Sequence, residues 1–326
     1  MYKTKTLFVS VMMMSTMMVM SSTSWMGMWM GMEMNMMSFI PLIKKKGSKD
    51  SSEAMMIYFL TQSVSSSVMM FSIIMMNMYT SSNNMIDSLL ISSLMVKMGA
   101  APFHMWIPEI MTKLSWNTCM VLMTWQKMAP LSVMSNIKTS NIMIISMVMS
   151  VIVGSMGGLN QTSLKKIMGY SSINHMGWMI SLNKIQSNWM MYMLIYSLMI
   201  MMTCTIFKKH NMMFINQINN MEMTMTEKMS IITSMLSLGG MPPLIGFLPK
   251  WMAIQTMMKM NMNMTLMVMM LFSLITLFFY MRTMSPFMLT QSKINKWNKS
   301  KINKKMMIII LMMNFSLPAV SMINML

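Results

Sequence analysis

The stretch LMVKMGAAPFHMWIPE, residues 94–109, combines features that an ordinary membrane helix avoids. Its flanks are apolar, but Lys97 lies inside the run and is followed closely by Gly99 and Pro102. Proline removes a backbone donor and breaks or kinks a helix. A lysine at the centre of a membrane helix costs about 2.5–3.5 kcal/mol on insertion scales. An ammonium group beside a helix break therefore indicates a function for both.

The composition of the whole chain is that of a helical membrane protein. Of its 326 residues, 55% are hydrophobic and only 10% are charged, whereas a soluble domain carries about 25% charged residues. Apolar runs of about twenty residues recur, as membrane helices require, without the alternating segments of a membrane β-barrel. We predict one all-α transmembrane domain, 1–326, with eleven spans at 6–22, 25–43, 55–78, 86–101, 117–136, 141–158, 167–182, 188–207, 229–258, 262–282 and 306–325.

Two of these spans are predicted to be broken. The first break follows Lys97, and the second lies in GGMPPLIGFLPKW, residues 239–251, within a segment too long for one straight span. Non-helical backbone is tolerated at membrane depth only where protein or water covers it. Interrupted helices of this kind form the ion and substrate sites of transporters. The start MYKTK could open a signal peptide, but without a small-x-small cleavage site we expect it to be retained.

The basic residues behind the net charge of +18 lie mostly in the connections between the predicted spans. Of the 25 lysines and arginines, nineteen fall in connections on the side of the N-terminus, three on the other side and three inside spans. This asymmetry is typical of membrane topology. The basic run 293–305 could suggest nucleic acid, but between two spans it indicates a solvated loop near anionic headgroups.

Several cofactor classes lack their sequence signals. The 69 methionines serve as apolar filler, since spaced clusters in soluble loops, as copper ligands need, are missing. The two cysteines, Cys119 and Cys204, form no C-x-x-C motif, and no dinucleotide-binding or P-loop motif follows a strand pattern. We expect no metal, iron–sulfur, flavin or nucleotide site in this chain.

Five ionisable residues lie inside the predicted spans at positions that membrane topology does not explain, and these are the candidate functional residues: Glu33, Lys97, Lys127, His175 and Lys250. Three of them have a plainer explanation. Lys97 could extend its ammonium to the interface, Lys250 could satisfy carbonyls freed by the prolines, and His175 could be a neutral core histidine. Buried Glu, Lys and His groups joined by water are also how proton relays are built.

The neighbours of two candidates support the relay. Gly27 and Gly31 lie one turn apart and allow another helix to approach just before Glu33. Ser171 shares a helix face with His175, and Asn174 lies beside it, which makes a polar stripe able to hold water. No nucleophile–base motif or metal-ligand cluster accompanies these residues, so transport is favoured over bond cleavage.

Several long stretches resemble one family, the antiporter-like membrane subunits of respiratory complex I, including the mitochondrially encoded ones. They are WMGMWMGMEMNMMSFIPLI (25–43), KMGAAPFHMWIPE (97–109), LMTWQKMAPL (122–131), GGLNQTSLKKIMGYSSINHMGWM (157–179) and LSLGGMPPLIGFLPKW (236–251). The resemblance covers residues 25 to 282. It implies a translocase subunit without a redox centre, in which Glu33 and Lys97 form the coupling pair. Lys127 is then the central-axis lysine, Lys250 belongs to the second broken helix, and His175 lies between them.

The resemblance also implies a setting. NADH, FMN, iron–sulfur clusters and ubiquinone would be bound by other subunits, and the partners would be membrane-arm subunits, neighbouring antiporter-like chains and lipids, cardiolipin among them. The chain would lie in the mitochondrial inner membrane, with the N-terminus in the matrix and the C-terminus in the intermembrane space. Two alternatives remain open: a self-sufficient cation/proton antiporter, and a scaffold subunit with vestigial charges. Pairing of Glu33 with Lys97 predicts that their charges lie within about 10 Å.

Overall fold

The structure is a computed structural model that describes residues 2–45, 48–78, 84–137, 140–183, 188–220, 223–289 and 304–317. Regular structure in these residues is helical, apart from one isolated β-bridge between Ser163 and Phe214. The elements are α1 (Tyr2–Ser21), α2 (Trp25–Ile43), α3 (Lys49–Met78), α4 (Asn84–Met98), α5 (Trp106–Lys113), α6 (Trp116–Met123), α7 (Trp125–Ser135), α8 (Asn141–Gly158), α9 (Leu164–Leu182), α10 (Asn188–Lys209), the 3₁₀-helix η1 (Ile215–Asn220), α11 (Met225–Gly239), α12 (Phe247–Lys259), α13 (Asn263–Leu289) and α14 (Lys304–Asn314).

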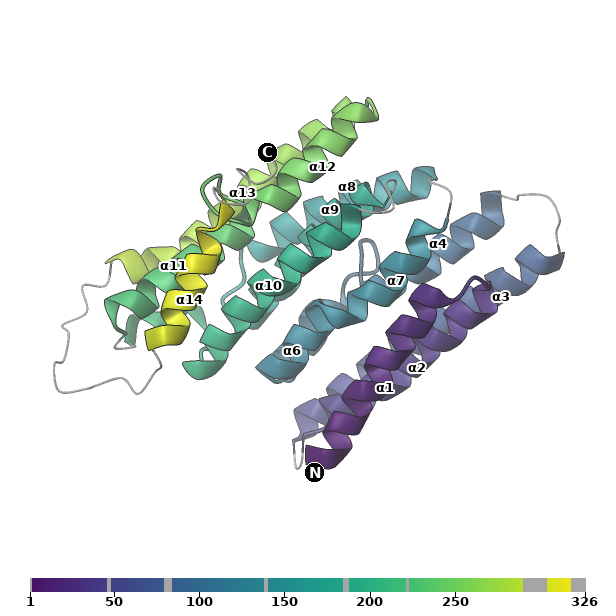
Figure 1. Ribbon diagram of the computed structural model, residues 1–326, viewed down its shortest axis with the longest axis horizontal. Helices are drawn as coiled ribbons and strands as arrows, with labels where there is room; N and C mark the ends of the chain where they lie inside the picture. Colours follow the sequence, from purple (N-terminus) through teal and green to yellow (C-terminus); the bar gives the residue numbers. More distant parts are fainter. Residues whose placement is uncertain are drawn as a thin grey trace.

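The helices form one elongated bundle with a shared tilt (Figure 1). Helices α1, α2 and α3 make up one end of the bundle, helices α11, α13 and α14 make up the other, and α4 to α10 lie between them. Neighbours in the chain pack together, as in α1 with α2, α3 with α4 and α8 with α9. Contacts of α4 with α7, and of α9 with both α5 and α12, join the two ends through the centre.

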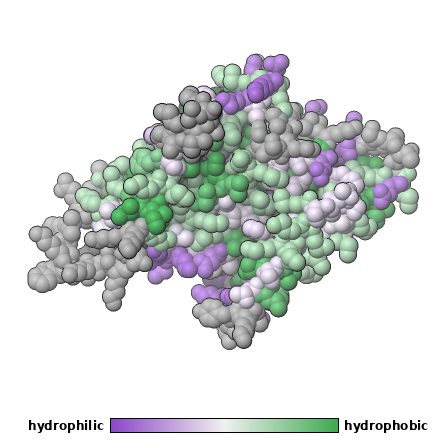
Figure 2. Space-filling view, viewed as in Figure 1, coloured by the Kyte–Doolittle hydropathy of each residue, from purple (hydrophilic) through white to green (hydrophobic). Residues whose placement is uncertain are grey.

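The outer surface is largely apolar, and the mainly apolar interior also holds polar and ionisable side chains. Met14, Ile145 and Phe278 are each more than 60% exposed, and Figure 2 shows hydrophobic side chains over much of one face, with hydrophilic residues in separate patches. Six basic residues are buried among many serines: Lys97, Lys127, Lys165, His175, Lys228 and Lys250. Apolar side chains outside and ionisable groups inside suit a protein whose solvent is lipid.

Length and hydropathy alone qualify four helices in the described residues as membrane-spanning: Lys49–Met78, Asn141–Gly158, Trp189–Lys209 and Asn263–Met288. Two predicted spans, 25–43 and 141–158, begin and end with α2 and α8. Helix α3 begins before its predicted span because its polar first turns continue the helix beyond the apolar segment. Residues 306–317 of the span predicted at 306–325 are described, and 306–314 belong to α14. The rest of that span, and the basic run 293–305 apart from its last two residues, lie outside the described residues.

The structure corrects one predicted span. Residues 117–136 were expected as one straight helix, but they form α6 and α7, which meet at Thr124. The Thr124 hydroxyl donates to the Met120 carbonyl at 2.7 Å, a local bond that bends helices. Pro130 then removes a backbone donor in α7. Hydropathy does not register either effect, so this third interruption was missed.

Candidate functional site

The first break separates α4 from α5 and lies directly after Lys97. Lys97 occupies the last turn of α4, where the negative end of the helix dipole favours a cation. Gly99 ends the helix with φ of 66°, a conformation that costs glycine little. The freed carbonyls have acceptor roles: Trp106 Nε1 donates to Val96 at 3.1 Å, and Gln62 Nε2 donates to Lys97 at 3.4 Å. The break is therefore covered by protein, as membrane depth requires.

Glu33 reaches Lys97 from a different helix. The Lys97 ammonium lies 3.6 Å from the Glu33 carboxylate, and the two side chains are 4% and 22% exposed. Helix α1 comes close to α2 just before Glu33, because a Cβ at Gly31 would lie 2.6 Å from a methyl group of Val19. The predicted approach of Glu33 and Lys97 is confirmed. The acid supplies the counter-ion that a buried ammonium requires.

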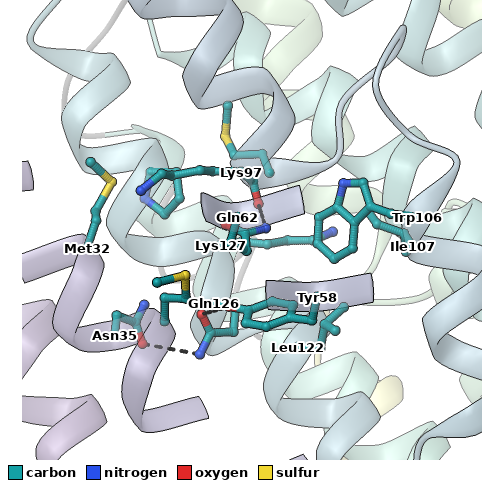
Figure 3. A pocket seen from close by; sticks show the side chains of 13 residues that line it. Met32, Asn35, Tyr58, Gln62, Lys97, Trp106, Ile107, Leu122, Gln126 and Lys127 are labelled. Carbon is teal, nitrogen blue, oxygen red and sulfur yellow. Dashed lines mark hydrogen bonds between the residues drawn. The ribbon is translucent and has the colours of Figure 1, made fainter. Parts of the chain in front are cut away.

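A cavity joins this pair to Lys127. It offers about 20 Å³ to water and is lined by both Lys97 and Lys127, which is enough for at least one water molecule. Figure 3 shows an amide chain below it: the Tyr58 hydroxyl donates to Gln126 Oε1 at 3.1 Å, and Gln126 Nε2 donates to Asn35 Oδ1 at 3.1 Å. The chain ties α3, α7 and α2 together around the cavity.

Lys127 contacts the helix that carries His175. Its ammonium donates to the Ser172 carbonyl at 2.9 Å and lies 5.5 Å from the centroid of the Tyr196 ring. The Tyr196 ring stacks at a tilt on the His175 imidazole, with centroids 4.8 Å apart. His175 Nδ1 and the Tyr192 hydroxyl share a hydrogen bond of 2.8 Å. Tyr196 is thus the side chain that lies between Lys127 and His175.

The second break separates α11 from α12 and holds Lys250. Gly240 ends α11 with φ of 78°, and Lys250, in the first turn of α12, donates to the Gly239 carbonyl at 2.6 Å. Helix α12 packs against α9, the helix that carries His175. The second break therefore lies beside the helix of His175.

The five candidates form one row across the interior of the bundle. It runs from Glu33 on α2 to Lys97 on α4, through the cavity to Lys127 on α7, past Tyr196 to His175 on α9, and on to Lys250 on α12, which packs against α9. Groups that can hold or release a proton therefore extend between the two broken helices. Such a row can carry protons where water completes the gaps.

Sequence reasoning missed the residues that connect the candidates. Tyr192 and Tyr196 sit in an apolar span where tyrosine is unremarkable, and Asn35 and Tyr58 gave no local signal. Gln126 was detectable: it is a polar residue next to Lys127 within a predicted span. A buried amide in such a position needs a partner, although the sequence does not say which one.

Comparison with known proteins identifies the class. The family profile described as "NADH:quinone oxidoreductase/Mrp antiporter, TM" matches residues 22–276. The chain therefore belongs to the NADH:quinone oxidoreductase/Mrp antiporter family.

Within the family, the chain is similar to proteins named NADH-ubiquinone oxidoreductase chain 2. The one from Locusta migratoria is 42% identical over 98% of this chain and 94% of its own length. The one from Anopheles gambiae is 43% identical over 95% of this chain and 93% of its own length. The family resemblance seen in the sequence stretches is confirmed.

Solved structures share the fold at much lower identity. A chain of respiratory complex I from Thermus thermophilus superposes with a TM-score of 0.86 at 18% identity, over 99% of this chain and 79% of that one. A chain of the Mrp complex from Dietzia sp. DQ12-45-1b gives a TM-score of 0.76 at 12% identity, over 86% of this chain and 59% of that one. At these identities, the similarities show that the chain shares the antiporter-like fold.

Proposed function

We propose that this chain is a proton-translocating membrane-arm subunit of respiratory complex I in the mitochondrial inner membrane. The observation that carries the proposal is the row of ionisable residues that crosses the interior of the bundle from Glu33 to Lys250. Its proton transfer would be driven by electron transfer from NADH to ubiquinone in other subunits, which would hold the FMN and the iron–sulfur clusters. The partners are other membrane-arm subunits, neighbouring antiporter-like chains and lipids.

The Glu33–Lys97 pair acts as the switch. While the carboxylate lies 3.6 Å from the ammonium, each charge stabilises the other in a poorly solvated site. A charge arriving beside Glu33, which is the more exposed partner, weakens the pair. Lys97 then stands as an uncompensated buried cation, and it releases its proton toward the cavity that it shares with Lys127.

Water and the tyrosine hydroxyls complete the route. The cavity has room for a water molecule, which would bridge Lys97 and Lys127. Beyond Lys127, the Tyr196 hydroxyl and Asn174 Oδ1 are buried and have no hydrogen-bond partner among the described residues. Buried polar groups are normally satisfied by protein or ordered water, so water beside these atoms carries the proton on toward His175 and Lys250.

Eleven membrane crossings, counting each broken helix once, and a matrix-facing N-terminus are part of the proposal. Connections assigned to the matrix side do meet: Lys5, Lys44, Lys45 and Lys113 line one open pocket. Lysines from further connections on that side line the pocket next to it. This arrangement supports the shared side for these loops.

Substitution of Lys127 by methionine tests the function. Methionine suits a membrane interior, and the Ser172 carbonyl keeps its helical position without the lysine, so the complex assembles. We expect proton pumping per NADH oxidised to fall at least tenfold, measured in inverted membrane vesicles of a relative altered at the matching position. The matched control is Lys259→Met, an exposed lysine at the end of α12, which leaves pumping unchanged.

The outcome separates the alternatives. Undiminished pumping in Lys127→Met would make the chain a scaffold with vestigial charges, and loss of assembly would make Lys127 a structural residue. Cation-driven proton transport by the isolated chain in liposomes would make it a self-sufficient antiporter.

A further inference from the structure

Three polar side chains of the cavity between Lys97 and Lys127 have no part in the proposed proton row: Asn35, Tyr58 and Gln126. All three line the cavity together with the two lysines, and they come from α2, α3 and α7. Asn35 and Tyr58 are buried and Gln126 is half-buried. Figure 3 shows them linked to one another by hydrogen bonds.

The partners of Gln126 fix which way its amide points. The Tyr58 hydroxyl donates to Gln126 Oε1 at 3.1 Å, while Gln126 Nε2 donates to Asn35 Oδ1 at 3.1 Å and to Met12 Sδ at 3.4 Å. A thioether sulfur can only accept a hydrogen bond, so the end of the amide beside Met12 is the nitrogen. The carbonyl end therefore faces Tyr58, and Tyr58 is the donor in the bond between them.

Helix α3 turns a polar side toward the cavity. Tyr58 and Gln62 lie four residues apart, so they share one side of the helix, and both line the cavity. Gln62 Nε2 donates to the Lys97 carbonyl at 3.4 Å. The Tyr58 side chain therefore lies on the side of α3 that faces the first break.

Two ring contacts hold the Tyr58 side chain in place. The rings of Phe39 and Trp106 meet it edge-on, with centroids at 5.0 Å and 6.1 Å. Trp106 is itself tied to the first break, where its indole nitrogen donates to the Val96 carbonyl at 3.1 Å. With the ring fixed, the hydroxyl can change only the direction of its hydrogen, and Gln126 decides that direction.

The direction of these hydrogen bonds makes the Tyr58 oxygen an acceptor. Because its hydrogen points at Gln126, the oxygen has only lone pairs left to offer to the cavity. The bonds run one way, from Tyr58 through Gln126 to Asn35, and hydrogen bonds in a chain polarise one another. Charged lysines bring only donors, so the hydrogens of a water molecule between Lys97 and Lys127 need such an acceptor.

We propose that Tyr58 is a further catalytic residue in the transfer of a proton from Lys97 to Lys127, and that Gln126 is the residue that positions it. An N–H bond of Lys97 breaks and leaves its electron pair on nitrogen, the cavity water gains the proton, and the neutral amine of Lys127 then takes it. While the water carries the extra proton, the Tyr58 oxygen accepts one of its hydrogens. That dipole is already oriented, so no group has to turn at this moment. The inference rests on the proposed function and adds a residue of α3 to it.

Removing the amide of Gln126 tests the positioning. Methionine is the substitute because it is unbranched, apolar and adaptable. Without the amide, the Tyr58 hydroxyl turns its hydrogen into the cavity and competes for the same water. We expect Gln126→Met to lower the rate of proton pumping about fivefold, in line with the loss of one neutral hydrogen bond. The assay uses inverted membrane vesicles of a relative altered at the matching position. The matched control is Gln255→Met, the same change at an exposed residue of α12, which leaves pumping unchanged.

A second variant shows whether the amide acts through the hydroxyl. Tyr58→Phe removes the hydroxyl and keeps the ring that contacts Phe39 and Trp106, and we expect it to lower pumping about fivefold as well. The double variant Gln126→Met/Tyr58→Phe should fall no further than the worse single variant. Two residues with independent effects would instead give a loss of about 25-fold, because their effects would multiply.

The solvent isotope effect separates proton transfer from packing. If transfer through the cavity water is impaired, this step limits pumping, and the ratio of the rates in H₂O and D₂O rises. We expect this rise in both single variants and not in Gln255→Met. A loss of packing would lower the two rates together and leave their ratio unchanged.

Two outcomes overturn the inference. Full pumping in Tyr58→Phe, where Lys127→Met pumps poorly, would mean that the proposed function holds and the hydroxyl has no part in it. A multiplied loss in the double variant, with an unchanged isotope ratio, would make Gln126 and Tyr58 structural residues. If Gln126→Met does not assemble, Tyr58→Phe decides by its pumping rate and its isotope ratio. Failure of the proposed function itself is a different result, undiminished pumping in Lys127→Met.

Discussion

Replacing Glu33 by glutamine isolates the charge of the proposed switch, because the side chain keeps its shape. The carboxylate and the Lys97 ammonium are 3.6 Å apart. At an effective dielectric constant of about 20, two unit charges at this distance attract by about 4–5 kcal/mol. Lys97 is 4% exposed, so water replaces little of that attraction. The buried ammonium loses its counter-ion, and the step that separates the pair is no longer controlled by an incoming charge.

We expect Glu33→Gln to lower coupled turnover at least tenfold while the complex still assembles. The assay is proton uptake and NADH oxidation in the same inverted vesicles, with the substitution at the matching position of a genetically tractable relative. The matched control is Glu53→Gln, which breaks the other ion pair in the described chain. Glu53 is 60% exposed in its pair with Lys113, and such a surface pair is worth about 0–1 kcal/mol.

The two results must differ for the reasoning to stand. If Glu33→Gln retains more than half of the coupled turnover in assembled complex, the pair is not the switch. The same conclusion holds if Glu53→Gln is equally damaging, since the effect would then reflect charge loss in general.

Three further outcomes are expected. Gly240→Ala should lower the thermal unfolding midpoint by a few degrees and reduce transport. A left-handed φ costs residues other than glycine about 1–2 kcal/mol, and a Cβ at this position would lie 2.9 Å from the Lys250 ammonium. Gly239→Ala is the control and should do neither, because its nearest neighbour lies 3.5 Å from the added Cβ. Burial lowers the pKa of His210, just beyond α10, below its ordinary 6.5, although the charge of Glu227 opposes the shift. The folded protein is therefore most stable above pH 6.5, where His210 is neutral in both states, and loses stability as the pH falls and the histidine must be protonated. His210→Gln should make the unfolding midpoint depend less on pH between about pH 7.5 and 5.5, and an unchanged dependence would refute this. A membrane-impermeant amine reagent should modify Lys44 and Lys208 from the same, matrix side of oriented inner-membrane vesicles, and modification from opposite sides would contradict the topology.

The sequence alone was sufficient for the class of protein and for the ionisable residues inside it. Hydropathy, charge and helix breaking are properties of single residues and short segments, so apolar runs, Lys97 beside Gly99, and the prolines before Lys250 can be read without a fold. The family followed from stretches that are themselves continuous in sequence. The break at Thr124 was missed because its cause is a side-chain hydrogen bond, which hydropathy and composition do not report.

Tertiary structure alone decided which of these residues meet. Glu33 and Lys97 lie on helices that the chain separates by a third, and their approach depends on how α1, α2 and α4 pack. Tyr196 gained its position between Lys127 and His175 only because α10 lies against α9. Contacts between helices depend on the shape and packing of whole faces, which no single segment encodes. For this reason the candidate residues could be named from the sequence, while their order across the bundle could not.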